Sequence, residues 1–203
     1  MSQPSSTFLA WLFRMPLIRR WSLMFCVKPE NVAEHSHQVA IVAHLLTVIK
    51  NSKFGGTLSP EKAATTALYH ECSETWLGDI VSPVKYSNPQ ITKEFKLLEQ
   101  AAEQQCLDSL PPELRGAFAD LVVQNNIEPE YAAVVKAADI ICAYVKAKDE
   151  LAHHNHEFDH VVAKMEPRIA ELRQQPEVAY FLDVFLASCN NTLDSLTQSQ
   201  QRR

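Results

Sequence analysis

Apolar residues recur along most of this chain at spacings of three and four positions, which is the pattern of one face of an α-helix. Glycine is scarce, with 4 among 203 residues, while alanine and leucine are frequent. No long linker rich in glycine, serine or proline divides the chain. The pattern therefore predicts an all-α protein, and the length fits a single domain over residues 1–203.

One predicted helix begins at Asn31 and runs to about Lys50. Asn31 is a typical N-cap residue, and Glu34 three positions later completes a capping-box pattern. His35 lies within the apolar arc of this helix. That arc contains Val39, Ile41, Val42, Leu45, Leu46, Val48 and Ile49. His35 is thus predicted to be buried, either as a core histidine with satisfied hydrogen bonds or, if it has partners, as a ligand.

A second helix, predicted over residues 59–78, carries His70, Glu71 and Glu74 within five positions. A serine, a proline and a glutamate at its start are strong N-terminal signals, and a glycine closes it. Four positions separate His70 from Glu74, so a continuous helix would place both on one face, with Glu71 about 100° away. An imidazole beside two carboxylates makes this stretch the best candidate for the middle of a metal site.

A third helix is predicted to start at Pro129 and to carry Asp139 at the border of its apolar arc. A carboxylate partly buried among aliphatic side chains is costly unless a cation or good hydrogen-bond donors compensate. Asp139 is therefore either paired with a neighbouring helix or arginine, or part of a functional site. The histidine-rich run 153–156 lies among polar residues at the end of this helix, and we interpret it as unrelated to metal binding.

Two further segments are candidates for binding. Arg20 and Trp21 lie in an Arg-Arg-Trp sequence, which is either an arginine pair covering apolar surface or the start of a phosphate site. Residues 80–89 contain two prolines and are predicted to be irregular, and loops beside a rigid scaffold often carry binding residues.

Composition and charge narrow the class of protein. The formal net charge is −5 and no run of lysine or arginine is present, which argues against a nucleic-acid polymer as partner. The 5 cysteines are scattered without a CxxC pair, as expected in the reducing cytoplasm. We see no signal peptide and no apolar stretch long enough for a membrane span. A cytoplasmic enzyme or binding protein acting on a small molecule fits these features.

The candidate residues and their local sequences, taken in order, resemble the HD superfamily of metal-dependent phosphohydrolases, and most closely the bacterial 5′-deoxynucleotidases. The similarity spans about 120 residues. It rests on Arg20-Trp21-Ser22-Leu23-Met24, Asn31-Val32-Ala33-Glu34-His35-Ser36, Gln38-Val39-Ala40, Lys53-Phe54-Gly55-Gly56, Tyr69-His70-Glu71-Cys72-Ser73-Glu74, Gly78-Asp79, Pro83-Val84-Lys85-Tyr86 and Lys136-Ala137-Ala138-Asp139.

The resemblance implies an HD-type helical bundle, a homodimer, and hydrolysis of deoxyribonucleoside 5′-monophosphates to deoxyribonucleoside and inorganic phosphate. It implies a divalent transition metal, typically cobalt or manganese. The metal ligands that match by position are His35, His70, Glu71 and Asp139.

The same resemblance assigns roles on the substrate side. Glu74 matches the catalytic acid that activates water, and Arg20 matches the base that orients the phosphate. Trp21 resembles the residue packed against the sugar, where bulk disfavours a 2′-hydroxyl. The loop Asp79, Ile80, Val81 and Ser82 matches the nucleoside-contacting segment, and His35 and Asp139 also border the substrate.

One position departs from the superfamily pattern. The usual His-Asp pair is His70-Glu71 in this chain. The extra methylene moves the carboxylate by roughly a bond length, ~1.5 Å, whereas productive site geometry tolerates ~0.5 Å. The alternative function is therefore an HD-fold nucleotide-binding or regulatory protein whose activity is weak or lost because Glu71 replaces aspartate.

Overall fold

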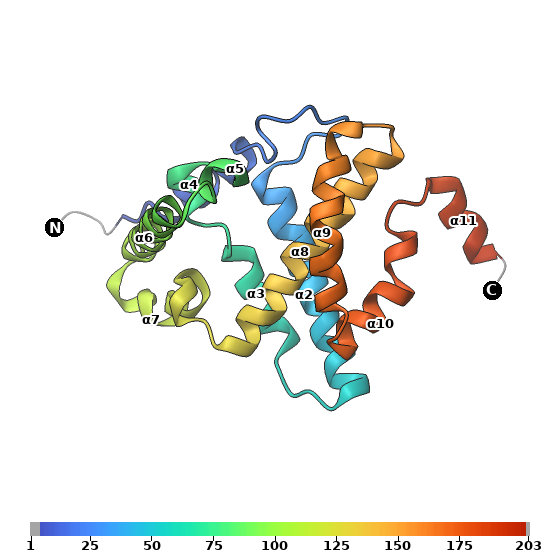
Figure 1. The fold of residues 1–203 in the computed structure, drawn as a ribbon. Helices are drawn as coiled ribbons and strands as arrows, with labels where there is room; N and C mark the ends of the chain where they lie inside the picture. Colours follow the sequence, from blue (N-terminus) through green and yellow to red (C-terminus); the bar gives the residue numbers. More distant parts are fainter. Residues whose placement is uncertain (1–4, 202–203) are drawn as a thin grey trace.

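The computed structural model describes residues 5–201, and those residues form helices joined by turns and short 3-10 segments (Figure 1). One isolated antiparallel bridge, between Arg19 and Asn31, is the β-type pairing in this part of the chain. The elements in order are α1 (Phe8–Leu12), η1 (Met15–Leu17), α2 (Val32–Phe54), α3 (Pro60–Tyr69), α4 (Glu74–Leu77), α5 (Ser82–Lys85), α6 (Pro89–Asp108), α7 (Pro112–Val122), η2 (Gln124–Asn126), α8 (Pro129–Ala152), η3 (His156–Phe158), α9 (Asp159–Leu172), α10 (Pro176–Val184), η4 (Leu186–Ser188) and α11 (Leu193–Gln201).

Helices α2 and α8 lie at the centre of the bundle (Figure 1). Helices α3, α9 and α10 pack against this pair, and the largest apolar core lies between these five helices. A smaller core joins α1, α6 and α7 on the side of the α3–α4 turn. Figure 1 shows α4, α6 and α7 on one side of the central pair and α9 and α10 on the other. The all-α prediction is confirmed.

The predicted start of α2 is confirmed in detail. The Asn31 side chain accepts a hydrogen bond from the Glu34 backbone N–H, and the Glu34 carboxylate accepts one from the Asn31 backbone N–H. These bonds satisfy helix N–H groups that otherwise lack partners. The helix continues past the predicted end to Phe54, where Gly55 adopts a left-handed conformation. Ile41, expected in the apolar arc, is 55% exposed, so the buried face is narrower than the helical-wheel pattern indicated.

The helix predicted over residues 59–78 is not continuous. Helix α3 ends at Tyr69, residues 70–73 form a tight turn, and α4 begins at Glu74. Cys72 is fully buried in the smaller core, with Sγ 3.6 Å from the Val122 carbonyl oxygen. The chain therefore breaks the helix to insert Cys72 between α6 and α7, although no glycine or proline marks the break.

The C-terminal region contains two irregular features. Pro167 lies inside α9 without ending it. The residues from Pro176 to Gln201 form α10, η4 and α11, separated by turns. None of the helices over residues 5–201 combines the length and the apolar character needed to span a bilayer.

Candidate active site

Four side chains from three parts of the fold converge at the centre of the molecule. His35 comes from the second turn of α2, His70 and Glu71 from the turn after α3, and Asp139 from the middle of α8. Each offers one potential ligand atom, and these atoms lie within 4.8 Å of one another. Two imidazoles and two carboxylates are a donor set suited to a divalent transition metal.

The His70 ring is oriented by the end of its own helix. Its Nδ1 lies 2.6 Å from the Ala67 carbonyl oxygen, and a carbonyl can only accept, so Nδ1 carries the proton. In the neutral ring, Nε2 is then unprotonated and carries a free electron pair. This Nε2 is buried without a hydrogen-bond partner and lies 3.4 Å from Glu71 Oε1. A buried acceptor without a partner is costly, and a cation at the cluster would satisfy it.

His35 and Asp139 form a close pair across the central helices. His35 Nε2 lies 3.2 Å from Asp139 Oδ1, and the His35 ring is fully buried. Burial lowers the pKa of His35, outweighing the hydrogen bond to Asp139, so the neutral ring that a metal requires is favoured. Burial raises the pKa of Asp139, but the bond to His35 and the charge of Lys136 outweigh it and hold that pKa well below its usual range.

Glu74 lies beside the cluster at the start of α4. Burial, followed by the charges of Glu71 and Asp79, raises the pKa of Glu74 to about 9, despite the opposing charge of Arg20. Its Oε2 is buried without a hydrogen-bond partner. A carboxyl group with a raised pKa and a free oxygen is suited to accepting and releasing protons near neutral pH once a cation neutralises its surroundings.

Arg20 and Trp21 lie beside the same cluster. Arg20 Nη1 lies 3.8 Å from Glu71 Oε1, and Arg20 Nε donates to Glu30 Oε2 at 2.9 Å. Burial lowers the pKa of Arg20, but the neighbouring carboxylates, Glu30 first, outweigh it and raise that pKa. The arginine is therefore a permanent positive charge facing the cluster. The surface-pair interpretation of this arginine is wrong, since its side chain is largely buried.

A cavity of about 930 Å³ opens next to the cluster. Arg20, Trp21, Glu74 and the whole segment 79–82 line it, together with Glu71 and Asp139. His35 and His70 are not among its lining residues. A pocket of this size, lined by carboxylates, basic side chains and apolar residues, can bind a small anionic molecule carrying an aromatic or sugar part.

The sequence did not single out several residues in or next to this cavity. Glu30, directly before the N-cap of α2, does not line the cavity, but its carboxylate contacts both Arg20 and Trp21. Four further cations line the cavity wall, namely Lys85, Lys136, Lys164 and Arg168. Lys136 is three positions before Asp139 and pairs with it at 2.8 Å, a spacing that the sequence does display. The histidine-rich run 153–156 is not part of this cluster.

Comparison with known proteins decides the family. The family profile described as 5′-deoxynucleotidase YfbR-like matches residues 7–189. The chain belongs to the YfbR-like family. A 5′-deoxynucleotidase of Vibrio cholerae is 49% identical over 192 residues, covering 95% of this chain and 98% of the relative. The 5′-deoxynucleotidase YfbR of Salmonella paratyphi B is 48% identical over 193 residues, covering 95% and 96%.

Two solved structures with the same fold are named HD-domain phosphohydrolases. One from Listeria innocua superposes with a TM-score of 0.79 at 21% identity, covering 90% of this chain and 88% of that one. A cyanophage S-2L HD phosphohydrolase, bound to dA and one catalytic Zn²⁺ ion, superposes with a TM-score of 0.63 at 20% identity, covering 92% and 99%. The YfbR-like chain therefore has the HD-domain fold, and the predicted superfamily and family are both confirmed.

Glu71 is compatible with the cluster in spite of its length. Although its side chain is one methylene longer than that of aspartate, a Glu71 oxygen lies with the other three candidate ligand atoms inside the 4.8 Å limit. Glu71 lies in the turn over residues 70–73, so its side chain leaves the backbone in a different direction than it would in a continuous helix. This YfbR-like chain thus presents a complete set of four potential ligands.

Proposed function

We propose that this protein, acting as a single domain, is a metal-dependent 5′-deoxynucleotidase that hydrolyses deoxyribonucleoside 5′-monophosphates to deoxyribonucleosides and inorganic phosphate. The observation that carries the proposal is the four-ligand cluster beside a cavity whose wall includes Arg20, Trp21 and Glu74. Near-full-length similarity to proteins named 5′-deoxynucleotidases supports the reaction and the substrate class.

The metal is held, in this proposal, by His35, His70, Glu71 and Asp139. Its two imidazole and two carboxylate ligands suit manganese or cobalt, the metals that the family resemblance implies. A bound divalent cation supplies Lewis-acid chemistry at the phosphate and lowers the pKa of water. His70 Nε2 supports this assignment, since this buried nitrogen of the cluster has no hydrogen-bond partner for its electron pair.

The protein's own groups supply the remaining chemistry. Glu74 accepts the proton of the attacking water, for which its free Oε2 is available. Arg20 contacts the phosphate and stabilises the charge that builds on the equatorial oxygens in the transition state. Trp21 packs against the deoxyribose and crowds the position of a 2′-hydroxyl. Asp79, Ile80, Val81 and Ser82 contact the nucleoside, and the functional unit is a cytoplasmic homodimer.

The direct test is phosphate release by the purified protein supplied with Mn²⁺ or Co²⁺. We expect release from dAMP, dGMP and TMP, and much slower release from AMP and GMP. The Glu74→Gln variant is the matched control, since glutamine has a similar shape but cannot accept the proton, and its rate should fall by at least about a hundredfold. Absence of phosphate release from every monophosphate would contradict the proposal.

A further inference from the structure

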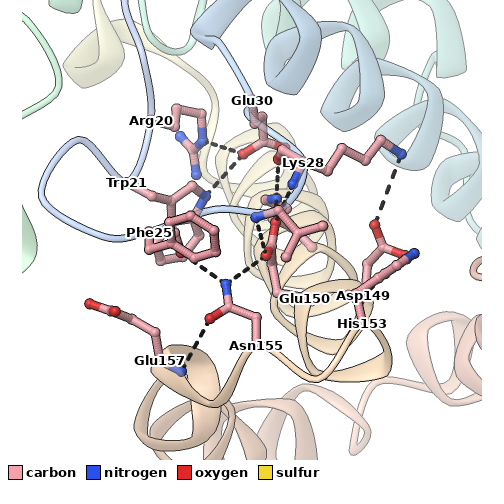
Figure 2. Close-up of polar contacts among 12 residues, drawn as sticks. Arg20, Trp21, Phe25, Lys28, Glu30, Asp149, Glu150, His153, Asn155 and Glu157 are labelled. Carbon is pink, nitrogen blue, oxygen red and sulfur yellow. Dashed lines mark hydrogen bonds and ion pairs between the residues drawn. The ribbon is translucent and has the colours of Figure 1, made fainter.

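Glu30 joins the two residues proposed to face the substrate. One of its oxygens, Oε2, accepts a hydrogen bond from Arg20 Nε at 2.9 Å and another from Trp21 Nε1 at 3.2 Å (Figure 2). The residue is 7% exposed, so water competes little for these bonds. Hydrogen bonds between a carboxylate and a guanidinium are short and directional. Glu30 therefore fixes the guanidinium plane and the indole plane relative to each other.

Trp21 needs such support because its backbone is strained. Its φ angle is +59°, a left-handed conformation that a bulky side chain rarely adopts. Two bonds hold it there: its backbone N–H donates to Asp79 Oδ2 at 3.2 Å, and its indole N–H donates to Glu30. The indole also contacts the ring of Phe158 edge to face, with centroids 5.3 Å apart. Loss of the Glu30 bond would leave the ring free to rotate away from the cavity.

Glu30 is itself held in place from two directions. Its carbonyl oxygen accepts from the Arg20 backbone N–H at 3.0 Å, next to the bridge between Arg19 and Asn31. Asn31 is the N-cap of α2, the helix that carries His35. The carboxylate that orients Arg20 and Trp21 thus stands directly before the helix that brings a proposed metal ligand.

The far part of the same loop is tied to α8 and η3 by Glu150, which is 1% exposed. Its carboxylate accepts from the backbone N–H groups of Val27 and Lys28 at 2.8 and 3.0 Å, and from Asn155 Nδ2 at 2.7 Å. Figure 2 shows this group below Glu30, with Asn155 also donating to the Phe25 carbonyl oxygen. Hydrogen bonds therefore tie the loop over residues 20–30 to the rest of the fold near both ends, and they hold Glu30 in place.

We propose that Glu30 is a positioning residue that sets the preference for deoxyribose over ribose by holding the Trp21 indole and the Arg20 guanidinium in one arrangement. The inference rests on the proposed function, because it assigns Trp21 to the sugar and Arg20 to the phosphate. Glu30 acts on the substrate through these two side chains and not by contact.

The test measures kcat/KM for dAMP and for AMP in wild type and in Glu30→Ala, with Mn²⁺ or Co²⁺ present. We expect the dAMP-to-AMP ratio to fall by about tenfold, the equivalent of one lost hydrogen bond. A loss of folded protein lowers both rates by the same factor and leaves the ratio unchanged. Glu30→Gln keeps an acceptor oxygen of the same reach and should retain most of the ratio.

Two further variants separate positioning from a general effect. Trp21→Ala should lower the dAMP-to-AMP ratio of kcat/KM. The double variant Trp21→Ala/Glu30→Ala should have the same ratio as Trp21→Ala, because both changes act through the same ring. Glu177→Ala is the matched control. This buried glutamate on α10 pairs with Lys50 at 3.3 Å, neither residue lines the cavity, and the substitution should leave the ratio at the wild-type value.

The outcomes distinguish this inference from the proposed function. An unchanged dAMP-to-AMP ratio in Glu30→Ala, or a wild-type enzyme without any preference, overturns the role of Glu30 while the nucleotidase activity stands. If wild type hydrolyses neither nucleotide, the proposed function fails. The preference for dAMP over AMP is then measured as the ratio of their dissociation constants, by calorimetry. A smaller binding preference for dAMP in Glu30→Ala than in wild type supports the positioning role, and an unchanged preference, or absence of binding, overturns it.

Discussion

Trp21 carries the steric part of the proposed selectivity. Because its ring lines the cavity and packs against Phe158, replacing it with alanine opens space where the sugar is proposed to lie. We expect Trp21→Ala to raise kcat/KM for AMP relative to dAMP by about tenfold or more, measured by phosphate release. Trp21→Phe keeps most of the bulk and should retain more of the preference. An identical ratio in wild type and Trp21→Ala would remove the ring from this role.

Glu71 is the proposed ligand that departs from the superfamily pattern, and metal content tests this assignment directly. Glu71→Ala removes one of four donors, so we expect the affinity for Mn²⁺ or Co²⁺ to fall at least about tenfold to a hundredfold, as even outer partners of metal ligands cost that much. The measurement is metal content by mass spectrometry after dialysis.

Glu71→Asp is the conservative control for that experiment. It keeps the carboxylate and should retain the metal, although the aspartate side chain is shorter and must reach the cluster from the turn over residues 70–73. Full metal retention by Glu71→Ala would show that three side chains suffice. A large gain in turnover by Glu71→Asp would instead favour the alternative in which glutamate weakens the activity.

At the residue scale, the four candidate ligands could be predicted because each combined an unusual residue type with a helical position or a family motif. Glu30 could not. Its partners lie ten and nine positions earlier in the chain, across a loop whose closure depends on a single bridge and on contacts with α8. Neither helical periodicity nor motif spacing encodes such a contact, so only the three-dimensional structure reveals it.

At the element scale, the cap of α2 was predictable and the break after Tyr69 was not. The cap follows from local hydrogen bonding between Asn31 and Glu34, which the sequence states directly. The break follows from burial of Cys72 against α6 and α7, a tertiary demand that overrides helix propensity. The same break directs Glu71 and Glu74 toward the site.

Glu150 predicts how the stability of the fold depends on pH in the acid range. Burial raises its pKa, but bonds from Asn155, Lys146 and the Val27 and Lys28 N–H groups outweigh this and lower the pKa to about 2, against 4.5 for an unperturbed glutamate. The stabilisation is therefore complete above pH about 4.5 and is lost as the pH falls toward 2. The expected result is a free energy of unfolding that decreases over this range in urea titrations.

Glu150→Gln should remove that part of the pH dependence. At neutral pH we expect it to lower the free energy of unfolding by about 3 kcal/mol, because Lys146 keeps a buried charge without its carboxylate partner. Glu177→Gln, which alters another buried glutamate, serves as the control. Equal acid sensitivity of wild type and Glu150→Gln would contradict the assignment.

At the scale of the whole molecule, the proposed ligands join α2, the end of α3 and α8, which together form the centre of the bundle. Metal binding should therefore stabilise the entire fold. At a free metal concentration one hundred times the Kd, the gain is about 2.7 kcal/mol. We expect chelation to lower the midpoint of thermal unfolding by several degrees, measured by calorimetry, and readdition of Mn²⁺ or Co²⁺ to restore it.

The His35→Ala variant is the control for this thermal shift. It removes a proposed ligand from α2, so added metal should raise its unfolding temperature much less than it raises that of wild type. A wild-type protein whose unfolding midpoint is unchanged by both chelator and metal would contradict a metal site at this position. A shift of undiminished size in His35→Ala would place the responsible ion elsewhere.

The loop over residues 20–30 leaves and re-enters the fold at neighbouring points, since Arg19 and Asn31 are paired. The side chains on α8 and η3 that hold this loop bind main-chain atoms of Phe25, Val27 and Lys28. These hydrogen bonds therefore do not depend on which side chains the loop carries there. Such a segment can be exchanged as a cassette without rerouting the chain. Grafting the corresponding loop of a relative should transfer its sugar preference while the ligand-bearing helices remain untouched, so the topology lets selectivity diverge independently of metal binding.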